Sequence, residues 1–281
     1  MKIQQKLAIG FFRTKINMLN LVNKKWAAQQ AFRLFCTPMM KSTYKGKVIP
    51  PHAEKLQFSL NGKQVKGFRF NHPQQKKLML LHGFSSSAFN FFKYVQPLEN
   101  KGYEVLAFDA PAHGESEGST VNAVEYSEMI KKVIELYGPV DAFIGHSFGG
   151  IAICLAMEQL VHNEETKIVL IAPATETSSA VDGAFQMLGI RNSVLRKEFD
   201  NIIFESSGKE LSWFSIRRAM NNINASVLWI HDEDDDITPL RDALQVKTDG
   251  HPNIRFLITK GLGHRKIYRD EDTVNAIVKF L

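Results

Sequence analysis

The most informative part of the chain is Ala142-Phe143-Ile144-Gly145-His146-Ser147-Phe148-Gly149-Gly150. It reads as an apolar strand that runs into Gly-x-Ser-x-Gly, and an apolar helical segment follows from Ile151. A sharp turn between such a strand and helix lifts the serine clear of the sheet in a strained backbone conformation. Gly145 and Gly149 leave room for this turn because neither carries a Cβ. The first N–H groups of the helix point toward Ser147 and favour negative charge there.

The composition is that of an ordinary globular protein. The chain has 281 residues, of which 44% are apolar and 23% are charged, and it is long enough to bury a large core. Its two cysteines, Cys36 and Cys154, lie far apart, so we expect no disulfide framework and a reducing, cytoplasmic compartment. No run of 18 apolar residues predicts a membrane span, and the first residues do not have the pattern of a signal peptide.

The formal net charge of +6 is unevenly distributed. Residues 1–50 contain ten Lys or Arg residues and no acidic residue, whereas residues 51–281 contain 25 basic and 29 acidic residues. The basic character therefore belongs to an N-terminal extension, and the rest of the chain is mildly acidic. No nucleic-acid-binding motif accompanies the charge, so nucleic acid is not an expected partner.

The basic extension, residues 1–50, is predicted to form two helices. Apolar residues from Ala8 to Val22 recur at near-helical spacing, and Asn23 is suited to cap a second helix that runs through Phe35. Amphipathic helices usually bury their apolar stripe internally, so we favour a helical pair packed on the core with solvated lysines. The alternative is a segment that covers the active site or makes a weak peripheral contact with an anionic membrane.

From about residue 55 onward, apolar strands alternate with helices. Asn61-Gly62 is a strong hairpin signal between the first two strands. The later strands are short and continuously apolar, as in parallel sheets that are buried on both faces. This alternation predicts an α/β fold with right-handed crossovers. The predicted strands span residues 55–60, 65–70, 78–82, 103–108, 142–146, 167–172, 226–230 and 254–259.

About fifty residues between Pro173 and Ala225 interrupt the alternation. They have helical character and are far longer than an ordinary connection in such a fold. They predict a helical insertion at about residues 175–224. One interpretation is a helical insertion with its own small core. The other is a cap over the active site whose apolar inner face lines a pocket. The two are compatible.

Three stretches at strand ends are suited to support a nucleophilic serine, because open α/β sheets bind ligands at that edge. The first, residues 82–86, is a glycine-containing loop that can aim the Phe84 N–H into the crevice beside the Phe148 N–H as an oxyanion hole; an ordinary turn is the alternative. The second, residues 231–239, holds four Asp and one Glu, and a histidine base needs one such carboxylate. These residues alone leave the choice of carboxylate open. The acidic loop lacks the spacing and the glycine of an EF-hand, so no metal is expected.

The third stretch, Lys260–Lys266, follows the last strand and carries His264 on a glycine-rich loop. Taken alone, His264 would be read as a surface histidine. Because it stands third in the order Ser, Asp, His, it is the best candidate for the catalytic base.

In this order, the motifs resemble the α/β-hydrolase superfamily in its capped, single-domain form, over residues 55–281. The resemblance implies a mostly parallel eight-stranded sheet with helices on both faces, a helical cap insertion and, here, extra N-terminal helices. That family places its carboxylate four residues before a proline, which implies Asp235 against Pro239. The other matches are Gly145–Gly149 to the nucleophile elbow, His82–Phe84 to the oxyanion loop, Asp109–Ser116 to the loop after the fourth strand and Gly263-His264 to the histidine loop.

Three positions depart from the pattern of the family. Asp232 stands where a glycine is usual, Thr238 where an apolar residue is usual, and Ala112 where a glycine is common. None of these changes removes a catalytic group. The crowding of acidic residues leaves Asp234 and Asp236 as alternatives to Asp235.

The resemblance implies a serine hydrolase that cleaves a carboxylic ester or thioester of an apolar acyl or aromatic substrate. Ser147 is the expected nucleophile, His264 the base and Asp235 its partner, with the backbone N–H groups of Phe84 and Phe148 as the oxyanion hole. This mechanism proceeds through an acyl-enzyme and needs no metal or organic cofactor. A serine at this position argues against the epoxide and haloalkane branches, which use an aspartate nucleophile.

Two other classes of function remain open. The first comprises acyltransferases, perhydrolases and carbon–carbon hydrolases or lyases, which share the same constellation of residues. The second is a non-catalytic ligand-binding or membrane-docked member of the superfamily. The sequence predicts neither the identity of the substrate nor the oligomeric state.

Overall fold

The computed structural model describes residues 3–39, 42, 44 and 46–281, with side chains from residue 9 onward. It divides the chain into two compact units. The helical unit consists of Met1–Thr37 and Glu176–Ser215, and the sheet unit consists of Pro38–Thr175 and Ile216–Leu281. The sequence predicted an extension of residues 1–50 and an insertion of about residues 175–224; most of both segments belongs to the helical unit.

The sheet unit is built on one eight-stranded sheet with the order β1-β2-β4-β3-β5-β6-β7-β8. The β1–β2 and β2–β4 pairs are antiparallel, and the five other pairs are parallel. The predicted α/β fold with a mostly parallel sheet of eight strands is confirmed. The strands are β1 (Glu54–Leu60), β2 (Lys63–Phe70), β3 (Lys76–Leu81), β4 (Tyr103–Phe108), β5 (Ala142–His146), β6 (Lys167–Ile171), β7 (Ser226–Asp232) and β8 (Ile254–Thr259).

The predicted hairpin joins β1 to β2. Asn61 and Gly62 have φ angles of 49° and 75°, in the left-handed region that Asn and Gly tolerate best. Leu60 pairs directly with Lys63 across the turn. The two-residue loop therefore sets the register of the antiparallel edge of the sheet.

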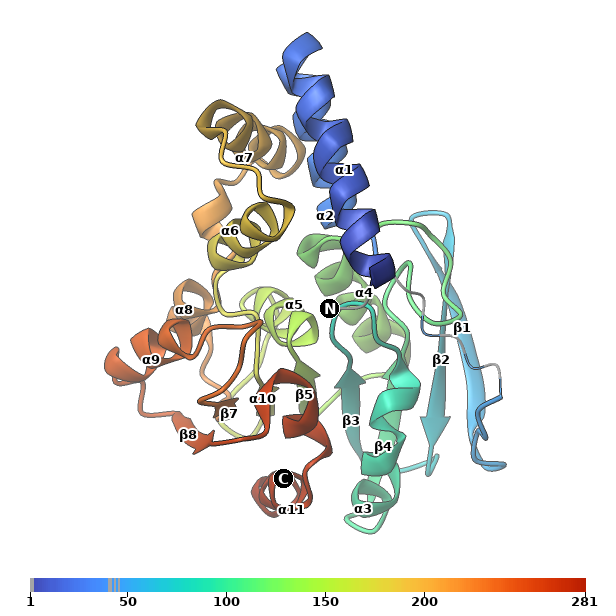
Figure 1. Cartoon of the computed structure of the whole chain (residues 1–281). Coiled ribbons are helices and arrows are strands. Elements are labelled where there is room, and N and C mark those ends of the chain that lie inside the picture. Colours follow the sequence, from blue (N-terminus) through green and yellow to red (C-terminus); the bar gives the residue numbers. More distant parts are fainter. Residues whose placement is uncertain (1–2, 40–41, 43, 45) are drawn as a thin grey trace. The chain divides into compact units, whose positions relative to one another are not determined.

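Helices cover both faces of the sheet (Figure 1), which is why its central strands are continuously apolar. On one face, Leu80 and Ile144 pack in a core with Phe91 and Ile277. On the other face, Phe108 stacks on Tyr137, with 5.8 Å between ring centroids. The helices of this unit are α3 (Val95–Glu99), α4 (Ala123–Tyr137), α5 (Phe148–Met157), α8 (Ile216–Ala219), α9 (Leu240–Thr248), α10 (Gly263–Lys266) and α11 (Glu271–Phe280), with 3₁₀ turns at Ala88–Tyr94, Met220–Asn222 and Ile267–Arg269.

The helical unit combines the two N-terminal helices with the helices of the insertion. Its centre is Phe199, which is fully buried and meets Phe32, Phe35 and Phe185 edge-on, with centroids 5.3 to 5.9 Å apart. As predicted, Asn23 caps the second helix, accepting a hydrogen bond from the Trp26 N–H at 2.9 Å. The helices of this unit are α1 (Ile3–Val22), α2 (Lys24–Phe35), α6 (Thr177–Leu188) and α7 (Ser193–Ser207), with a 3₁₀ turn at Leu211–Trp213. The side chain of Ala8, which entered the predicted helical pattern, lies outside the described residues.

Candidate active site

Ser147 lies at the junction between β5 and α5. Its φ and ψ angles are 53° and −115°, a conformation that is strained for a residue with a side chain. The surrounding turn is tight, because a Cβ on Gly149 would come within 2.5 Å of the Leu81 carbonyl oxygen and one on Gly145 within 2.5 Å of Ile153 Cδ1. The two glycines therefore leave the room that the sequence pattern predicts.

The structure brings the two predicted oxyanion-hole residues together beside this turn. Phe84 follows β3, Phe148 begins α5, and their ring centroids lie 5.4 Å apart. The loop of Phe84 also closes on Ser147, since a Cβ on Gly83 would lie 3.1 Å from Ser147 Cβ. Phe84 and Phe148 therefore both lie beside Ser147, one in the loop after β3 and one at the start of α5.

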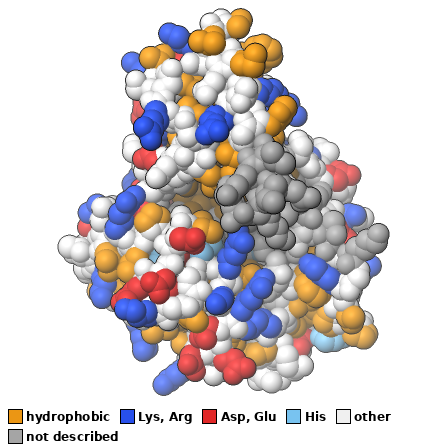
Figure 2. All heavy atoms as spheres, in the orientation of Figure 1, with side chains coloured by type: hydrophobic (Ala, Val, Ile, Leu, Met, Phe, Trp, Pro, Cys, Tyr) orange, Lys and Arg blue, Asp and Glu red, His pale blue; other side chains and the backbone are white. Residues whose placement is uncertain are grey.

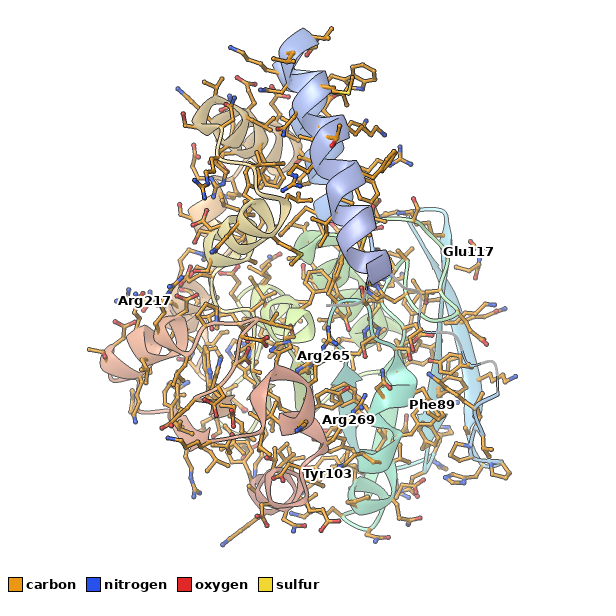
Figure 3. All side chains as sticks on the ribbon, viewed as in Figure 1. Phe89, Tyr103, Glu117, Arg217, Arg265 and Arg269 are labelled. Carbon is orange, nitrogen blue, oxygen red and sulfur yellow. The ribbon has the colours of Figure 1, made fainter. Side chains whose placement is uncertain are left out.

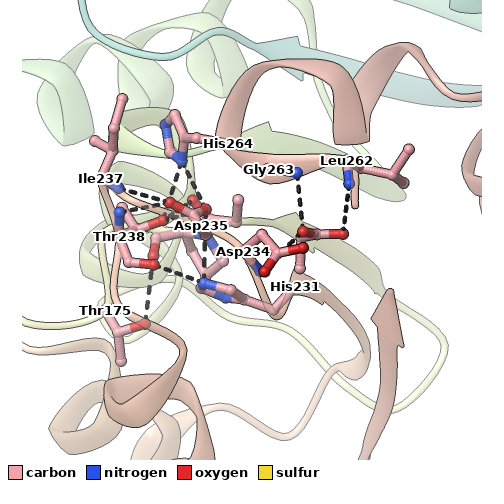
Figure 4. A network of polar contacts seen from close by, with 12 residues as sticks. Thr175, His231, Asp234, Asp235, Ile237, Thr238, Leu262, Gly263 and His264 are labelled. Atoms are coloured by element: carbon pink, nitrogen blue, oxygen red, sulfur yellow. Dashed lines mark hydrogen bonds and ion pairs between the residues drawn. The ribbon is translucent and has the colours of Figure 1, made fainter. Parts of the chain in front are cut away.

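His264 and Asp235 form a direct pair (Figure 4). His264 Nδ1 lies 2.8 Å from Asp235 Oδ2, and both side chains are almost fully buried, with exposed fractions of 7% and 0%. Because the carboxylate accepts the Nδ1 proton, the neutral ring presents the lone pair of Nε2 on its other side. The following residue, Arg265, is exposed on α10 (Figure 3).

The carboxylate of Asp235 accepts several further hydrogen bonds. Its Oδ1 accepts from the backbone N–H groups of Ile237 and Thr238 at 2.9 and 2.8 Å, and its Oδ2 from the Thr238 hydroxyl at 2.9 Å. Burial works against the charge, but hydrogen bonds and the attraction of His264 outweigh it, so the pKa of Asp235 lies below its usual value. The carboxylate is therefore ionised at neutral pH.

The nucleophile turn and the histidine loop are linked through His146. His146 Nε2 lies 2.9 Å from the backbone carbonyl oxygen of His264, and the two ring centroids are 4.7 Å apart. Burial and the neighbouring His264 ring lower the pKa of His146 to about 3. The neutral ring therefore donates its Nε2 proton to the His264 carbonyl oxygen, which connects the histidine loop to the residue before Ser147. No hydrogen bond between the Ser147 hydroxyl and His264 is recorded among the described residues.

A family model described as "Alpha/beta hydrolase family" matches residues 78–276, which include the serine turn, the acidic loop and the histidine loop. The chain belongs to the α/β-hydrolase family. Its fold is similar to that of an esterase from Pyrococcus furiosus, with a TM-score of 0.63 and 17% sequence identity over 86% of this chain and 96% of that one.

Two curated relatives match shorter parts of the chain. An uncharacterized hydrolase of Bacillus subtilis, YugF, is 33% identical over 107 residues, which is 36% of this chain and 39% of the relative. Methylesterase 1 of Arabidopsis thaliana is 30% identical over 114 residues, which is 37% of this chain and 43% of the relative. The match thus spans less than half the length of either relative.

In this α/β-hydrolase, the acidic loop also holds the histidine loop in place, which the sequence analysis missed. Asp232 accepts hydrogen bonds from the backbone N–H groups of Leu262 and Gly263 at 3.1 and 2.8 Å and from the Thr259 hydroxyl at 2.7 Å. Asp234 accepts one from the Gly261 N–H at 3.0 Å. Burial opposes the charge of Asp232, but these donors hold its pKa below the usual value. The only sequence signal was the acidic residue at a position where the family usually has glycine.

Thr238 is the second departure from the family pattern, and it too has a role in the site. Besides its bond to Asp235, its hydroxyl oxygen lies 3.1 Å from His264 Nδ1, and its carbonyl oxygen accepts a hydrogen bond from His231 Nε2 at 2.8 Å. Burial lowers the pKa of His231, so this ring is neutral and donates. Thr238 therefore connects the Asp235–His264 pair to β7.

A second group of buried polar residues supports the loop that carries Phe84. His113 Nε2 accepts a hydrogen bond from the Ser85 N–H at 2.9 Å, and Asp109 accepts one from the Ala88 N–H at 2.9 Å. Asp109 also accepts the hydroxyl of Tyr44 at 2.8 Å. Tyr44 precedes β1 and has no counterpart in the minimal fold, so no motif identified it.

A polar cleft of about 670 Å³ lies at a different edge of the sheet unit. It is lined by residues 162–165, 220, 221, 223, 224 and 251–253, which precede the parallel strands β6, β7 and β8. Ser147, in contrast, follows the carboxyl end of β5. The cleft is therefore separate from the chemistry described above.

The described residues include neither a helix that could span a membrane nor a cluster of metal-binding side chains. No helix there is long and apolar enough to cross a membrane. In the same part of the chain, no group of three or more His, Cys, Asp or Glu side chains is arranged to hold a metal ion.

Proposed function

We propose that this α/β-hydrolase is a serine hydrolase that cleaves a carboxylic ester or thioester through an acyl-enzyme. The observation that carries the proposal is the buried His264–Asp235 pair, held by His146 against the strained turn of Ser147. The name of the Arabidopsis relative, Methylesterase 1, supports an ester as the substrate class.

Each residue has a defined role in this mechanism. The Ser147 hydroxyl attacks the carbonyl carbon while His264 Nε2 takes its proton, and Asp235 stabilises the imidazolium that forms. The N–H groups of Phe84 and Phe148 stabilise the oxyanion, whose charge appears only in the transition state. The imidazolium then protonates the leaving group, and His264 activates the water that releases the acid.

An apolar acyl or aromatic group fits the surroundings of the serine. The rings of Phe84 and Phe148 lie side by side at the nucleophile turn, and Phe148 also meets Tyr126 at 5.3 Å between centroids. Such a surface favours the burial of hydrocarbon over that of a sugar or a phosphate. We also propose that the helical insertion forms a cap. The proposed substrate is a small molecule, and the proposed location of the protein is the cytoplasm.

The proposal is tested by hydrolysis of a chain-length series of p-nitrophenyl esters by the wild type and Ser147→Ala. We expect turnover in the wild type and a loss of about 10⁴-fold or more in the variant, with an unchanged circular dichroism spectrum. The preferred chain length reports the size of the acyl pocket.

If no ester is turned over, labelling with a fluorophosphonate probe tests the nucleophile by itself. Labelling of the wild type but not of Ser147→Ala supports an active serine with a different acyl substrate. An unlabelled wild-type protein contradicts the proposal and favours a ligand-binding function.

A further inference from the structure

Helix α1 of the helical unit leaves a row of large apolar side chains in solvent. Phe11, Met18 and Val22 are 65%, 64% and 83% exposed, and Leu21 next to them is 87% exposed. Positions 11, 18 and 22 are separated by seven and four residues, so they lie on one face of the helix. Trp26, at the start of α2, is 49% exposed and extends the row.

This row is not part of the core of the helical unit. Within that unit, α1 buries Ile16, which is 1% exposed, and α2 buries Ala27, Ala28 and Ala31. These buried residues, and not the residues of the row, pack α1 and α2 inside the helical unit. The row is a second apolar face, which a monomeric soluble protein seldom leaves in water without a function.

Basic residues flank the apolar row. Lys15, four residues after Phe11, is exposed on α1, and Lys24 and Lys25 are exposed at the start of α2. Lys25 also forms an ion pair with Glu205 of α7 at 2.8 Å. Neither α1 nor α2 contains an acidic residue, and the helical unit as a whole has eleven basic and six acidic residues. In Figure 2, hydrophobic side chains gather with Lys and Arg side chains in the upper part of the view.

We propose that this surface, the α1–α2 face (Phe11, Met18, Leu21, Val22 and Trp26 with Lys15, Lys24 and Lys25), docks the protein on an anionic lipid bilayer. Apolar side chains enter the boundary between headgroups and acyl chains, while Lys and Arg pair with anionic headgroups. A tryptophan is well suited to that boundary because its ring is apolar and its N–H is polar.

The charge decides between the bilayer and a second copy of the chain. Two α1–α2 faces brought together would oppose basic residues with no acidic residue on either α1 or α2 to neutralise them. An anionic bilayer offers both the hydrocarbon and the negative charge that this face lacks. The inference is independent of the catalytic proposal, since none of these residues belongs to the site of Ser147.

Co-sedimentation of the full chain with vesicles tests the proposal. Vesicles of phosphatidylcholine and phosphatidylglycerol in equal parts should bind the protein, and pure phosphatidylcholine vesicles should bind it at least about tenfold more weakly. Binding to the mixed vesicles should decrease as salt is added, because salt screens the lysines.

Two pairs of variants separate the apolar and basic contributions. Leu21→Ser/Val22→Ser should weaken binding at least about tenfold, whereas Val48→Ser/Val161→Ser should not, although Val48 and Val161 of the sheet unit are 84% and 105% exposed.

Likewise, Lys15→Gln/Lys24→Gln should weaken binding, whereas Lys55→Gln/Lys76→Gln, which changes two exposed lysines of the sheet unit, should not. The fluorescence of the wild type should shift to the blue on anionic vesicles, and Trp26→Phe should abolish that shift.

Three results would overturn the proposal. The first is a failure of the wild type to sediment with the mixed vesicles. The second is equal weakening by the sheet-unit control variants. The third is a dimer in sedimentation velocity that Leu21→Ser/Val22→Ser dissociates, since the face would then serve a second copy of the chain.

Discussion

Asp235 receives hydrogen bonds from His264, Ile237 and Thr238 on one buried carboxylate. Its neighbour Asp236 is exposed. The sequence left these acidic residues as alternatives, and only the spacing to Pro239 favoured Asp235. Asp235 and Asp236 have the same side chain but different surroundings. The same substitution at each position therefore tests whether Asp235 is the carboxylate that supports His264.

Asp235→Asn should lower kcat by about 10³- to 10⁴-fold, because an amide neither stabilises the imidazolium nor favours the required tautomer of His264. Asp236→Asn is the matched control and should stay within about twofold of the wild type. Ester hydrolysis measures both, with thermal unfolding to confirm that the variants fold. Equal losses in the two variants would contradict the assignment of the carboxylate.

Loops rather than single residues position the histidine. The backbone of residues 261–263 is held by Asp232 and Asp234, which lie at the end of β7 and in the loop after it. Gly261 and Gly263 have φ angles of 83° and 59°, which other residues rarely adopt. The hydrogen bonds therefore join the acidic loop and the histidine loop into one element, and this element positions His264.

Asp232→Asn should weaken this element, because an amide nitrogen cannot accept the N–H groups that the carboxylate accepts. We expect a loss of about 2 to 3 kcal/mol in the free energy of unfolding and a fall of about tenfold or more in kcat. Urea unfolding and ester hydrolysis measure the two effects. Glu233→Gln, at an exposed neighbour whose carboxylate forms an ion pair with Lys260, should change neither; a similar loss there would contradict a role for Asp232 in particular.

Phe199 should stabilise the helical unit selectively, since it packs against α2 and α6 from α7. Phe199→Ala should cost about 3 to 5 kcal/mol through lost burial and the cavity that remains. Hydrogen exchange should then speed up in residues 24–35 and 193–207, with little change in β3 to β6. Uniform acceleration over both units would contradict an independent core.

For the whole molecule, three buried histidines make the stability depend on pH. Burial lowers the pKa of His82 to about 4, burial and His264 lower that of His146 to about 3, and burial lowers that of His231. Each pKa is lower in the folded than in the unfolded state, where histidine titrates near 6.5. The neutral histidines therefore contribute stability above that pH, and this contribution is lost as the pH falls toward the folded values.

Between about pH 6 and 4.5, the free energy of unfolding should fall by about 1.4 kcal/mol per pH unit for each of His82 and His146. His146→Gln keeps a side-chain N–H for the His264 carbonyl but cannot titrate. The variant should therefore lack the contribution of His146 to the pH dependence of the free energy of unfolding, and its slope should be smaller than that of the wild type. Urea unfolding at several pH values measures the slope. An unchanged slope in His146→Gln would contradict the burial of a neutral His146.

Much of this protein follows from the sequence alone, because the relevant signals are local. Continuously apolar strands, a two-residue Asn-Gly hairpin and a serine between glycines each depend on neighbouring residues. They predicted all eight strands, the turn of Ser147 and the Asn23 cap. The order Ser, Asp, His identified candidates for a site whose catalytic role awaits the experiments above.

The tertiary structure alone decided which distant residues support those candidates. The bond from His146 to His264 joins residues 118 apart, and that from Tyr44 to Asp109 joins residues 65 apart. It likewise decided that α1 and α2 pack with the insertion and leave an apolar face exposed. Such contacts depend on how the elements pack, and local spacing carries no information about packing between distant segments.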